Sequence, residues 1–204
     1  MKIRLNVLYA AEKERLEGLS QLGNGDYRNP VFGEGPVNAR VMFVGEAPGR
    51  EEAEAGHPFV GKAGRQLNEL LELAGIDRNE VYVTNAVKFR PTKLSARGAS
   101  NRTPTAAELA AGEELLKSEI LAVCPRIIAT LGNSPLTSIS KISCATVPKI
   151  GAAHGKPIEI EIEENKIKLY PLYHPASGIY NRELVVTMKE DIVALGRLIK
   201  EGIE

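Results

Sequence analysis

The chain has 204 residues, of which 43% are hydrophobic and 25% are charged, and its 26 basic side chains balance 26 acidic ones. These values are ordinary for one soluble globular domain, here residues 1–204, and the zero net charge leaves any nucleic-acid binding to local basic patches. No apolar run approaches the roughly 18 residues of a membrane span, and the N-terminus lacks a signal-peptide pattern. We therefore expect a cytoplasmic monomer with no membrane contact.

The predicted elements alternate between helices and short apolar strands. In order they are a helix over residues 1–22, a strand at 41–44, a helix from 62 to 75, a strand at 81–87, a loop over 88–104, a helix that starts at the capping box of 105–108, a strand at 126–131, a helix that starts at 132–135, a hairpin of strands 156–161 and 166–170, and a helix over 183–202. This alternation predicts an α/β fold, a three-layer α/β/α sandwich with a mostly parallel central sheet.

Three of the predicted strands end in polar residues. Glu46 follows the first strand, Asn85 lies at the end of the second, and His174 follows the last. Because ligands bind at the carboxyl ends of strands in open α/β sheets, we expect these side chains to line one pocket. Phe59 lies in an apolar Pro-Phe-Val segment of the loop after Glu46, where its ring would stack on a flat ligand.

These four side chains suit one kind of chemistry. The Asn85 amide offers a donor and an acceptor that can read the edge of a pyrimidine, and the Phe59 ring would stack on the base. The His174 imidazole would stabilise negative charge on a leaving oxygen, while the Glu46 carboxylate would position water or stabilise an oxocarbenium-like sugar. Taken singly, each residue has an ordinary structural explanation, in a turn, in the core or at a strand end. Their occurrence together favours a functional pocket.

Five motifs, in order, resemble those of the uracil-DNA glycosylase superfamily, most of all its thermostable branch, called family 4. They are Gly45-Glu46-Ala47-Pro48-Gly49, Pro58-Phe59-Val60-Gly61-Lys62-Ala63-Gly64, Val83-Thr84-Asn85, Thr130-Leu131-Gly132 and His174-Pro175-Ala176. The resemblance implies that Glu46 belongs to the water-activating loop, whose Gly45 and Ala47 contact the substrate. It also implies that Phe59 stacks on a flipped uracil, that Asn85 reads the base edge, and that His174 stabilises the uracil anion at O2.

The same branch usually holds a [4Fe–4S] cluster on four cysteines, and this chain departs from that pattern. In register with the motifs, the four positions fall at or near Leu19, Leu22, Phe89 and Gly112. The two cysteines of the chain, Cys124 and Cys144, lie elsewhere, form no C-x-x-C pair and cannot supply four thiolates. We therefore expect no cluster, no other metal and no organic cofactor, with apolar packing in place of the cluster.

Two further segments predict contacts with DNA. No acidic residue lies between Glu80 and Glu108, and the basic residues of this segment suit phosphate contacts beside the pocket. The segment after His174 resembles the minor-groove loop of the superfamily, in which Ile179 or Tyr180 would fill the space left by the flipped base. The predicted DNA-binding residues are Lys62, Arg90, Lys93, Arg97, Ser177, Ile179, Tyr180 and Arg182.

The sequence thus predicts a monofunctional uracil-DNA glycosylase of base-excision repair. Acting on single- or double-stranded DNA, it would flip deoxyuridine out and hydrolyse the N-glycosidic bond, leaving free uracil and an abasic site. One alternative is a glycosylase for hypoxanthine, xanthine or another deaminated base, because the Asn85 amide can rotate to match other edges. A second alternative is a protein that binds uracil or abasic sites in DNA without turnover. A nucleotide-binding protein is not favoured, because the chain lacks a phosphate-binding loop motif.

Overall fold

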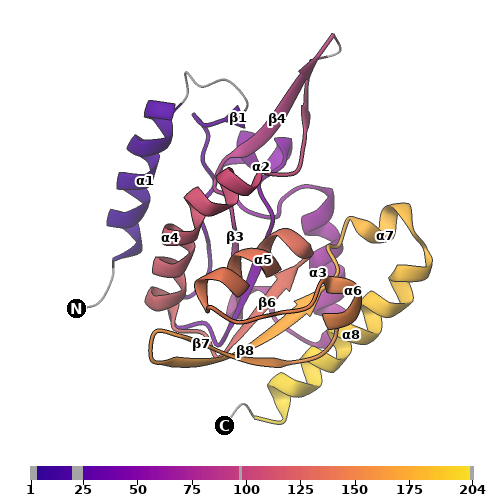
Figure 1. Cartoon of the computed structure of the whole chain (residues 1–204). Coiled ribbons are helices and arrows are strands. Elements are labelled where there is room, and N and C mark those ends of the chain that lie inside the picture. Colours follow the sequence, from indigo (N-terminus) through magenta and orange to yellow (C-terminus); the bar gives the residue numbers. More distant parts are fainter. Residues whose placement is uncertain (1–3, 20–24, 97, 203–204) are drawn as a thin grey trace.

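The structure, a computed structural model, describes residues 4–19, 25–96 and 98–202. Its centre is a five-stranded sheet in the strand order β3-β2-β6-β8-β7 (Figure 1). The strands are β2 (Val41–Gly45), β3 (Tyr82–Asn85), β6 (Ile127–Leu131), β7 (Ile158–Ile162) and β8 (Asn165–Leu172). β2, β3, β6 and β8 run parallel, and β7 pairs antiparallel with β8. The predicted mostly parallel sheet and the predicted hairpin of its last two strands are both confirmed.

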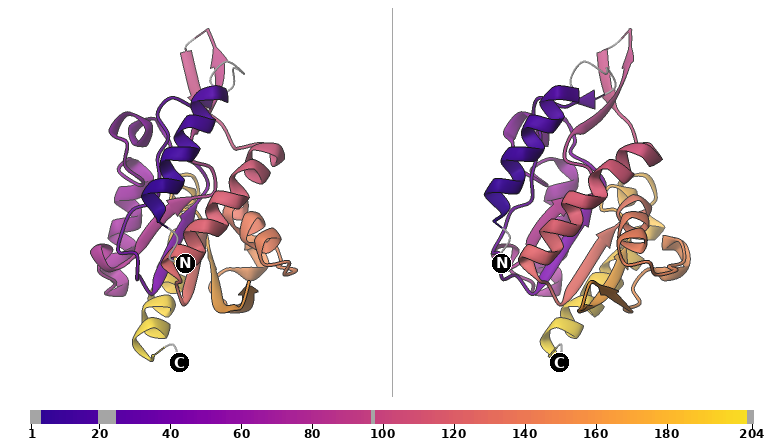
Figure 2. Two further views of the ribbon diagram at one scale, coloured as in Figure 1. Left: turned by 90° about the vertical axis from the view of Figure 1, so that its left-hand side faces the viewer. Right: turned by 60° about the vertical axis from the view of Figure 1, so that its left-hand side comes forward.

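Helices cover both faces of this sheet. They are α1 (Leu5–Leu19), α3 (Lys62–Ala74), α4 (Ala106–Val123), α5 (Asn133–Ile142) and α8 (Glu183–Lys200). Successive side chains of a strand point to opposite faces. In β2, Val41 and Phe43 pack in the cluster that contains α3 and α8, whereas Met42 and Val44 pack with α1, α4 and α5. The predicted three-layer α/β/α arrangement is therefore confirmed (Figure 2).

Several boundaries differ from the prediction. Shorter helices occur as α2 (Arg50–Ala55), η1 (Arg78–Glu80), α6 (Ile150–Ala153) and α7 (Ser177–Tyr180). The sequence pattern did not reveal α2, and of the helix predicted over residues 1–22 only the part within 4–19 is described. The predicted capping box is present: Thr105 Oγ1 accepts a hydrogen bond from Glu108 N, and Glu108 Oε2 accepts one from Thr105 N. No helix among the described residues is long and apolar enough to cross a membrane.

The segment predicted as a loop over residues 88–104 is instead a β-hairpin, so that prediction is wrong. β4 (Arg90–Ser95) pairs antiparallel with β5 (Gly98–Asn101), and the short strand β1 (Gly25–Asp26) pairs with the other edge of β4. Every residue of β5 is exposed, so its sequence carries no alternation of apolar and polar positions. The hairpin is held by backbone pairing and by a turn in which Gly98 has a φ of 100°.

Candidate active site

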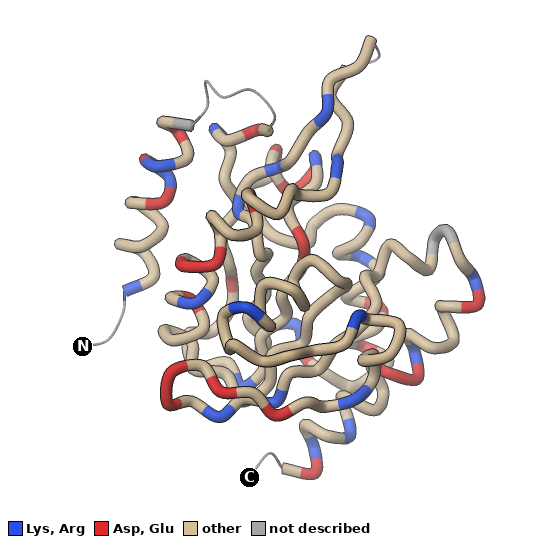
Figure 3. The backbone as a smooth tube through the Cα atoms, viewed as in Figure 1, with Lys and Arg blue, Asp and Glu red and all other residues tan. Residues whose placement is uncertain are grey.

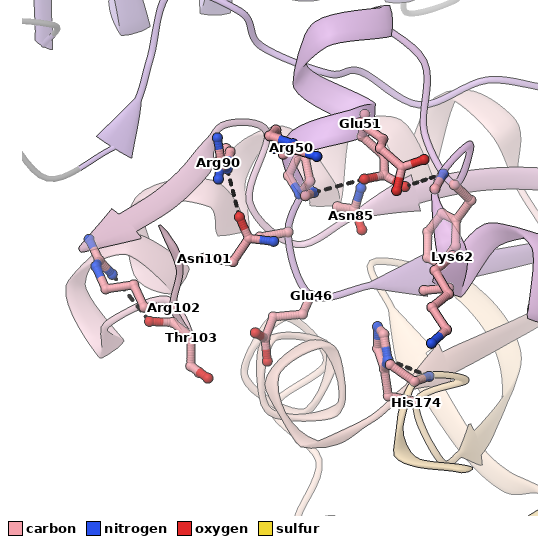
Figure 4. A pocket seen from close by; sticks show the side chains of 18 of the residues that line it. Glu46, Arg50, Glu51, Lys62, Asn85, Arg90, Asn101, Arg102, Thr103 and His174 are labelled. Atoms are coloured by element: carbon pink, nitrogen blue, oxygen red, sulfur yellow. Dashed lines mark hydrogen bonds between the residues drawn. The ribbon is translucent and has the colours of Figure 1, made fainter. Parts of the chain in front are cut away.

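The carboxyl ends of the four parallel strands meet at one edge of the sheet. From β2 the chain passes through α3 to β3 on one side, and from β3 through α4 to β6 on the other side of β2. Ligands bind at such a switch point in open α/β sheets. A cavity of about 860 Å³ opens there, and Glu46, Phe59, Asn85 and His174 all line it (Figure 4). The structure thus brings together the four side chains that the sequence singled out.

The floor of the cavity is formed by Asn85 and Phe59, and Gly45 lies against both side chains without itself lining the cavity. Gly45 and Asn85 are paired in the register of β2 and β3. A Cβ atom at position 45 would lie 2.4 Å from Asn85 Oδ1 and 2.5 Å from Phe59 Cζ, so only glycine leaves room for both side chains. Phe59 has a φ of 58°, which is uncommon for a bulky residue and indicates that the surrounding loop holds its ring in place.

The Asn85 amide is shielded yet unpaired. Asn85 is only 3% exposed and lines the cavity. No described residue forms a hydrogen bond with its side-chain amide. The amide atoms are accessible from the cavity, so they are free to form hydrogen bonds with a ligand there. The arrangement is therefore typical of a group whose partner is a ligand.

A buried ion pair lies behind this strand end. Lys88 Nζ lies 2.6 Å from Glu119 Oε2 and donates hydrogen bonds to Thr84 Oγ1 at 2.7 Å and to the Asn85 carbonyl oxygen at 2.6 Å. The side chains of Lys88 and Glu119 are 1% and 0% exposed. Burial lowers the pKa of Lys88, and the nearby Glu119 carboxylate opposes that change. Since Tyr9 OH also donates to Glu119 at 2.7 Å, the network fixes the backbone that carries the Asn85 amide.

His174 is held in one tautomer. Its Nδ1 accepts a hydrogen bond from Ala176 N at 3.2 Å, which leaves the proton of the neutral ring on Nε2. Burial lowers the pKa of His174 below its usual value, an effect that the Glu52 carboxylate only partly offsets. At neutral pH the side chain is thus an uncharged ring that can donate a hydrogen bond from Nε2.

Glu46 is oriented by the first turn of α5. Ser134 Oγ donates a hydrogen bond to Glu46 Oε2 at 2.6 Å, and no described residue bonds to Oε1. The sequence analysis placed Ser134 at a helix start and assigned it no role. Its contact with Glu46 joins positions 88 residues apart, which no local pattern could reveal.

Glu52 closes the loop between β2 and α3. Its carboxylate accepts hydrogen bonds from Gly49 N at 3.1 Å and from Gly61 N at 2.7 Å, so one side chain joins the two ends of the loop that carries Phe59. The sequence analysis also missed this residue. A glycine followed three residues later by glutamate is half of a capping box, which was the available signal for α2.

The predicted DNA-binding residues are only partly brought together. Lys62 and Arg90 line the cavity, and Figure 3 shows basic residues along the hairpin of β4 and β5. Lys93 is exposed and lies outside the cavity, as do Ser177 and Arg182. Arg97 lies outside the described residues. Ile179 and Tyr180 belong to α7, but their side chains are not described, so both stay predictions.

The residues at the expected cluster positions do not fit an iron–sulfur cluster. Phe89 and Gly112 line one cavity of about 170 Å³ with Leu16 and Tyr27, so the two positions do converge. The Phe89 ring packs on Tyr27 with the centroids 4.3 Å apart, and a Cβ at position 112 would lie 2.3 Å from the Ala86 carbonyl oxygen. Leu22 and the side chain of Leu19 lie outside the described part of the chain.

Thiolate ligands are also missing from the rest of the described structure. Cys124 and Cys144 are free and exposed. Within residues 4–19, 25–96 and 98–202, no group of three or more histidine, cysteine, aspartate or glutamate side chains is placed to hold a metal ion.

The fold and the site together define an α/β protein with a polar cavity at its strand ends, lined by an aromatic ring and an amide. The family model of the uracil DNA glycosylase superfamily matches residues 32–195. The chain belongs to this superfamily.

Relatives with curated names agree with this assignment. A Type-4 uracil-DNA glycosylase of Thermotoga maritima is 38% identical over 175 residues, which cover 85% of this chain and 84% of the relative. A Type-4 uracil-DNA glycosylase of Sulfurisphaera tokodaii is 37% identical over 171 residues, 83% of this chain and 74% of the relative. A Type-5 uracil-DNA glycosylase of Pyrobaculum aerophilum is 33% identical over 162 residues, 72% of this chain and 66% of the relative.

Proposed function

We propose that the protein is a uracil-DNA glycosylase that hydrolyses the N-glycosidic bond of deoxyuridine in DNA. The observation that carries this proposal is the unpaired Asn85 amide beside the Phe59 ring at the floor of the cavity. The similarity of the chain to several Type-4 uracil-DNA glycosylases over most of its length supports the same activity. Damaged or mispaired bases are the least costly to extrude, so uracil opposite guanine and uracil in single strands are the favoured substrates.

Base recognition is assigned to the floor. The Asn85 amide would donate a hydrogen bond to uracil O4 and accept one from N3–H, while the Phe59 ring stacks on the base. The Lys88 contact to the Asn85 carbonyl supports this role, because it prevents the backbone from shifting when a base with a different edge enters. Ala47 lines the cavity beside Glu46 and would contact the base or sugar, whereas Gly45 would act by leaving room for the Asn85 and Phe59 side chains.

Bond cleavage is assigned to the two strand-end side chains that flank the floor. As the C1′–N1 bond breaks, its electron pair leaves with the base, and negative charge develops on uracil O2. His174 Nε2–H would donate a hydrogen bond to that oxygen. Glu46, oriented by Ser134, would accept a hydrogen bond from the water that attacks C1′ and stabilise positive charge on the sugar. The water supplies the hydroxyl group at C1′, and the departing uracil anion then gains a proton.

The remaining parts of the proposal concern cofactor, assembly and DNA contacts. No iron–sulfur cluster is bound, because Phe89 and Gly112 occupy two positions where the cluster would need cysteines. The packing of Phe89 on Tyr27 supports the fold there in place of a cluster. The protein works as a monomeric, cytoplasmic single domain over residues 1–204. Lys62 and Arg90 contact phosphates beside the cavity, and the α7 loop supplies the wedge, Ile179 or Tyr180.

The experiment that tests the activity uses oligonucleotides with one defined lesion. Single- and double-stranded DNA containing uracil, hypoxanthine, xanthine or thymine is incubated with the protein and treated with alkali, which breaks the chain at abasic sites. We expect cleavage at uracil alone, strongest in U·G duplexes and single strands. Preferential cleavage at hypoxanthine or xanthine would assign a different base, and tight binding of uracil-DNA without cleavage would assign a binding protein.

A further inference from the structure

The β4–β5 hairpin extends away from the rest of the fold. In the views of Figures 1 and 2 its outer end lies beyond every helix. Arg90, Ala99 and Asn101, from the two strands of the hairpin, line that cavity. The hairpin is therefore continuous with the site.

Strand alternation determines which hairpin side chains face the cavity. Thr92 pairs with Asn101 and Leu94 pairs with Ala99, so these four share one face of the ribbon with Arg90. The hydrogen bond from Arg90 Nε to Asn101 Oδ1, at 2.6 Å, confirms that both residues point to the same side. Since Asn101, Ala99 and Arg90 line the cavity, Leu94 is the next position outward on the cavity side.

Leu94 is unusual for an apolar side chain. It is 77% exposed, the highest value for a large apolar residue in the described part of the chain. Its cross-strand partner Ala99 is exposed too, so the two side chains form a small apolar patch on an otherwise polar hairpin. No acidic residue lies between Glu80 and Glu108, and Lys93 is exposed and, as the neighbour of Leu94 in the strand, lies on the opposite face. An apolar side chain flanked by cations matches the chemistry of a DNA groove, which combines apolar base edges and anionic phosphates.

The base of the hairpin is anchored to the fold. Arg102 donates two hydrogen bonds to the Glu108 carboxylate, each at 2.7 Å, and a third from Nε to the Thr92 carbonyl oxygen at 2.9 Å. Arg102 is thereby committed to joining the ribbon to the first turn of α4. The base of the ribbon is therefore fixed to the first turn of α4 and does not behave as a free loop.

We propose that the β4–β5 hairpin inserts into a groove of duplex DNA beside the extruded nucleotide, with Leu94 packed against the flanking base pairs. This inference rests on the proposed function. Two-stranded ribbons fit DNA grooves, and inserted apolar side chains keep a base step unstacked. Arg90 and Asn101 of the hairpin and His174, which precedes α7, line the cavity from different sides (Figure 4), so the hairpin would act on the duplex independently of the α7 loop. Leu94 then assists extrusion from duplex DNA and has no role with a single strand.

The test compares excision from duplex and single-stranded substrates under single-turnover conditions. Leu94→Ala should lower the rate on a U·A duplex about tenfold, which corresponds to about 1.4 kcal/mol, and leave the rate on the single strand unchanged. Leu94→Met, which retains an apolar side chain of similar size, should restore most of the duplex rate. The matched control is Leu73→Ala, the same truncation at an exposed leucine of α3 that lies outside the cavity.

A fluorescent base analogue next to the uracil gives a second readout, because its signal rises when the step is unstacked. Leu94→Ala should reduce that rise, and Leu73→Ala should not. Equal rates for both alanine variants on the duplex, or equal losses on duplex and single strand for Leu94→Ala, would overturn this inference alone. Failure of the unmodified protein to excise uracil from either substrate would overturn the proposed function as well.

Discussion

The floor and the rim of the cavity are built in opposite ways. On the floor, Asn85 is 3% exposed and its strand end is fixed by the Lys88–Glu119 pair, whose two side chains are almost fully buried. On the rim, the hairpin is mostly solvent-exposed, and its outer half carries Lys93 and Leu94. Buried, fixed groups discriminate between ligands because a mismatched polar group is left unpaired, whereas exposed charges are screened by salt. We therefore propose that the floor sets the choice of base and that the rim sets the affinity for the DNA backbone.

The largest effect is expected from breaking the ion pair beneath the floor. Lys88→Met removes the cation but keeps a similar shape, so Glu119 is left buried without its main partner. Loss of one member of a buried pair costs about 3–5 kcal/mol of unfolding free energy. Urea unfolding measures that cost, and Lys88→Met combined with Glu119→Gln should recover part of it. A loss below about 1 kcal/mol would mean that the pair does not stabilise the floor.

Removal of either strand-end group should abolish most of the chemistry without preventing binding. Glu46→Ala and His174→Ala are each expected to slow single-turnover excision by about 10²–10³-fold, as loss of one preorganised stabilising group does in other enzymes. Affinity for uracil-containing DNA, measured by fluorescence anisotropy, should change little. Near-normal rates in both variants would contradict the roles assigned to these residues.

Asn85 and Phe59 should affect base recognition in different ways. Asn85→Asp keeps the shape but replaces the donor to O4 with a negative charge, so uracil excision should fall steeply and weak cytosine excision should emerge. Phe59→Leu should weaken every flipped base alike by about 1–3 kcal/mol, the scale of base–aromatic stacking. Excision rates on matched uracil and cytosine duplexes check both variants. A change in base preference from Phe59→Leu, with none from Asn85→Asp, would reverse the assignment.

The pH dependence of the rate tests the state of His174. Burial lowers its pKa below the usual 6.5, so the neutral form that donates from Nε2 persists as the pH falls through 6.5. The excision rate should therefore be level from pH 8 down past about 6.5 and fall only at lower pH, as the ring becomes protonated. A His174→Gln variant should lose this acid limb. A midpoint at or above the usual histidine pKa would contradict a buried, neutral imidazole.

The smallest effect is expected on the rim. Neutralising Arg90, Lys93 and Arg97 together should weaken DNA binding without changing base preference. For every phosphate that the variant no longer neutralises, the slope of log affinity against log salt concentration should become shallower by about 0.9 on duplex DNA. Binding isotherms at several salt concentrations measure the slope. If the slope is unchanged, the basic residues are only solvated and the rim has no role in DNA affinity.

The sequence was most informative where local chemistry and topology coincide. Glu46, Asn85 and His174 were found because each ends or follows a parallel strand, and parallel strand ends share one edge of the sheet. The support behind them was not found, since Glu119 lies 31 residues from Lys88 and Ser134 lies 88 residues from Glu46. Contacts of that range depend on how helices pack on the sheet, which no local motif records.

The hairpin shows a second limit of sequence reasoning. β5 has the sequence Gly-Ala-Ser-Asn, without an apolar face to mark it as a strand. Its conformation comes from backbone pairing with β4 and from the anchored base at Arg102, both of which are tertiary features. The acid-free charge pattern of the segment predicts contacts with DNA, and that prediction does not depend on whether the segment is a loop or a hairpin.

The most direct test of the account is to measure uracil release and iron content on the same protein preparation. The protein is incubated with a duplex that contains one U·G pair, and free uracil and abasic DNA are quantified. We expect one uracil and one abasic site per duplex, from protein whose iron content is far below one cluster per chain and whose absorbance near 400 nm, roughly where cysteine-ligated clusters absorb, is negligible. No uracil release, or release that rises in proportion to bound iron, would contradict the central claim that this strand-end pocket excises uracil without a cluster.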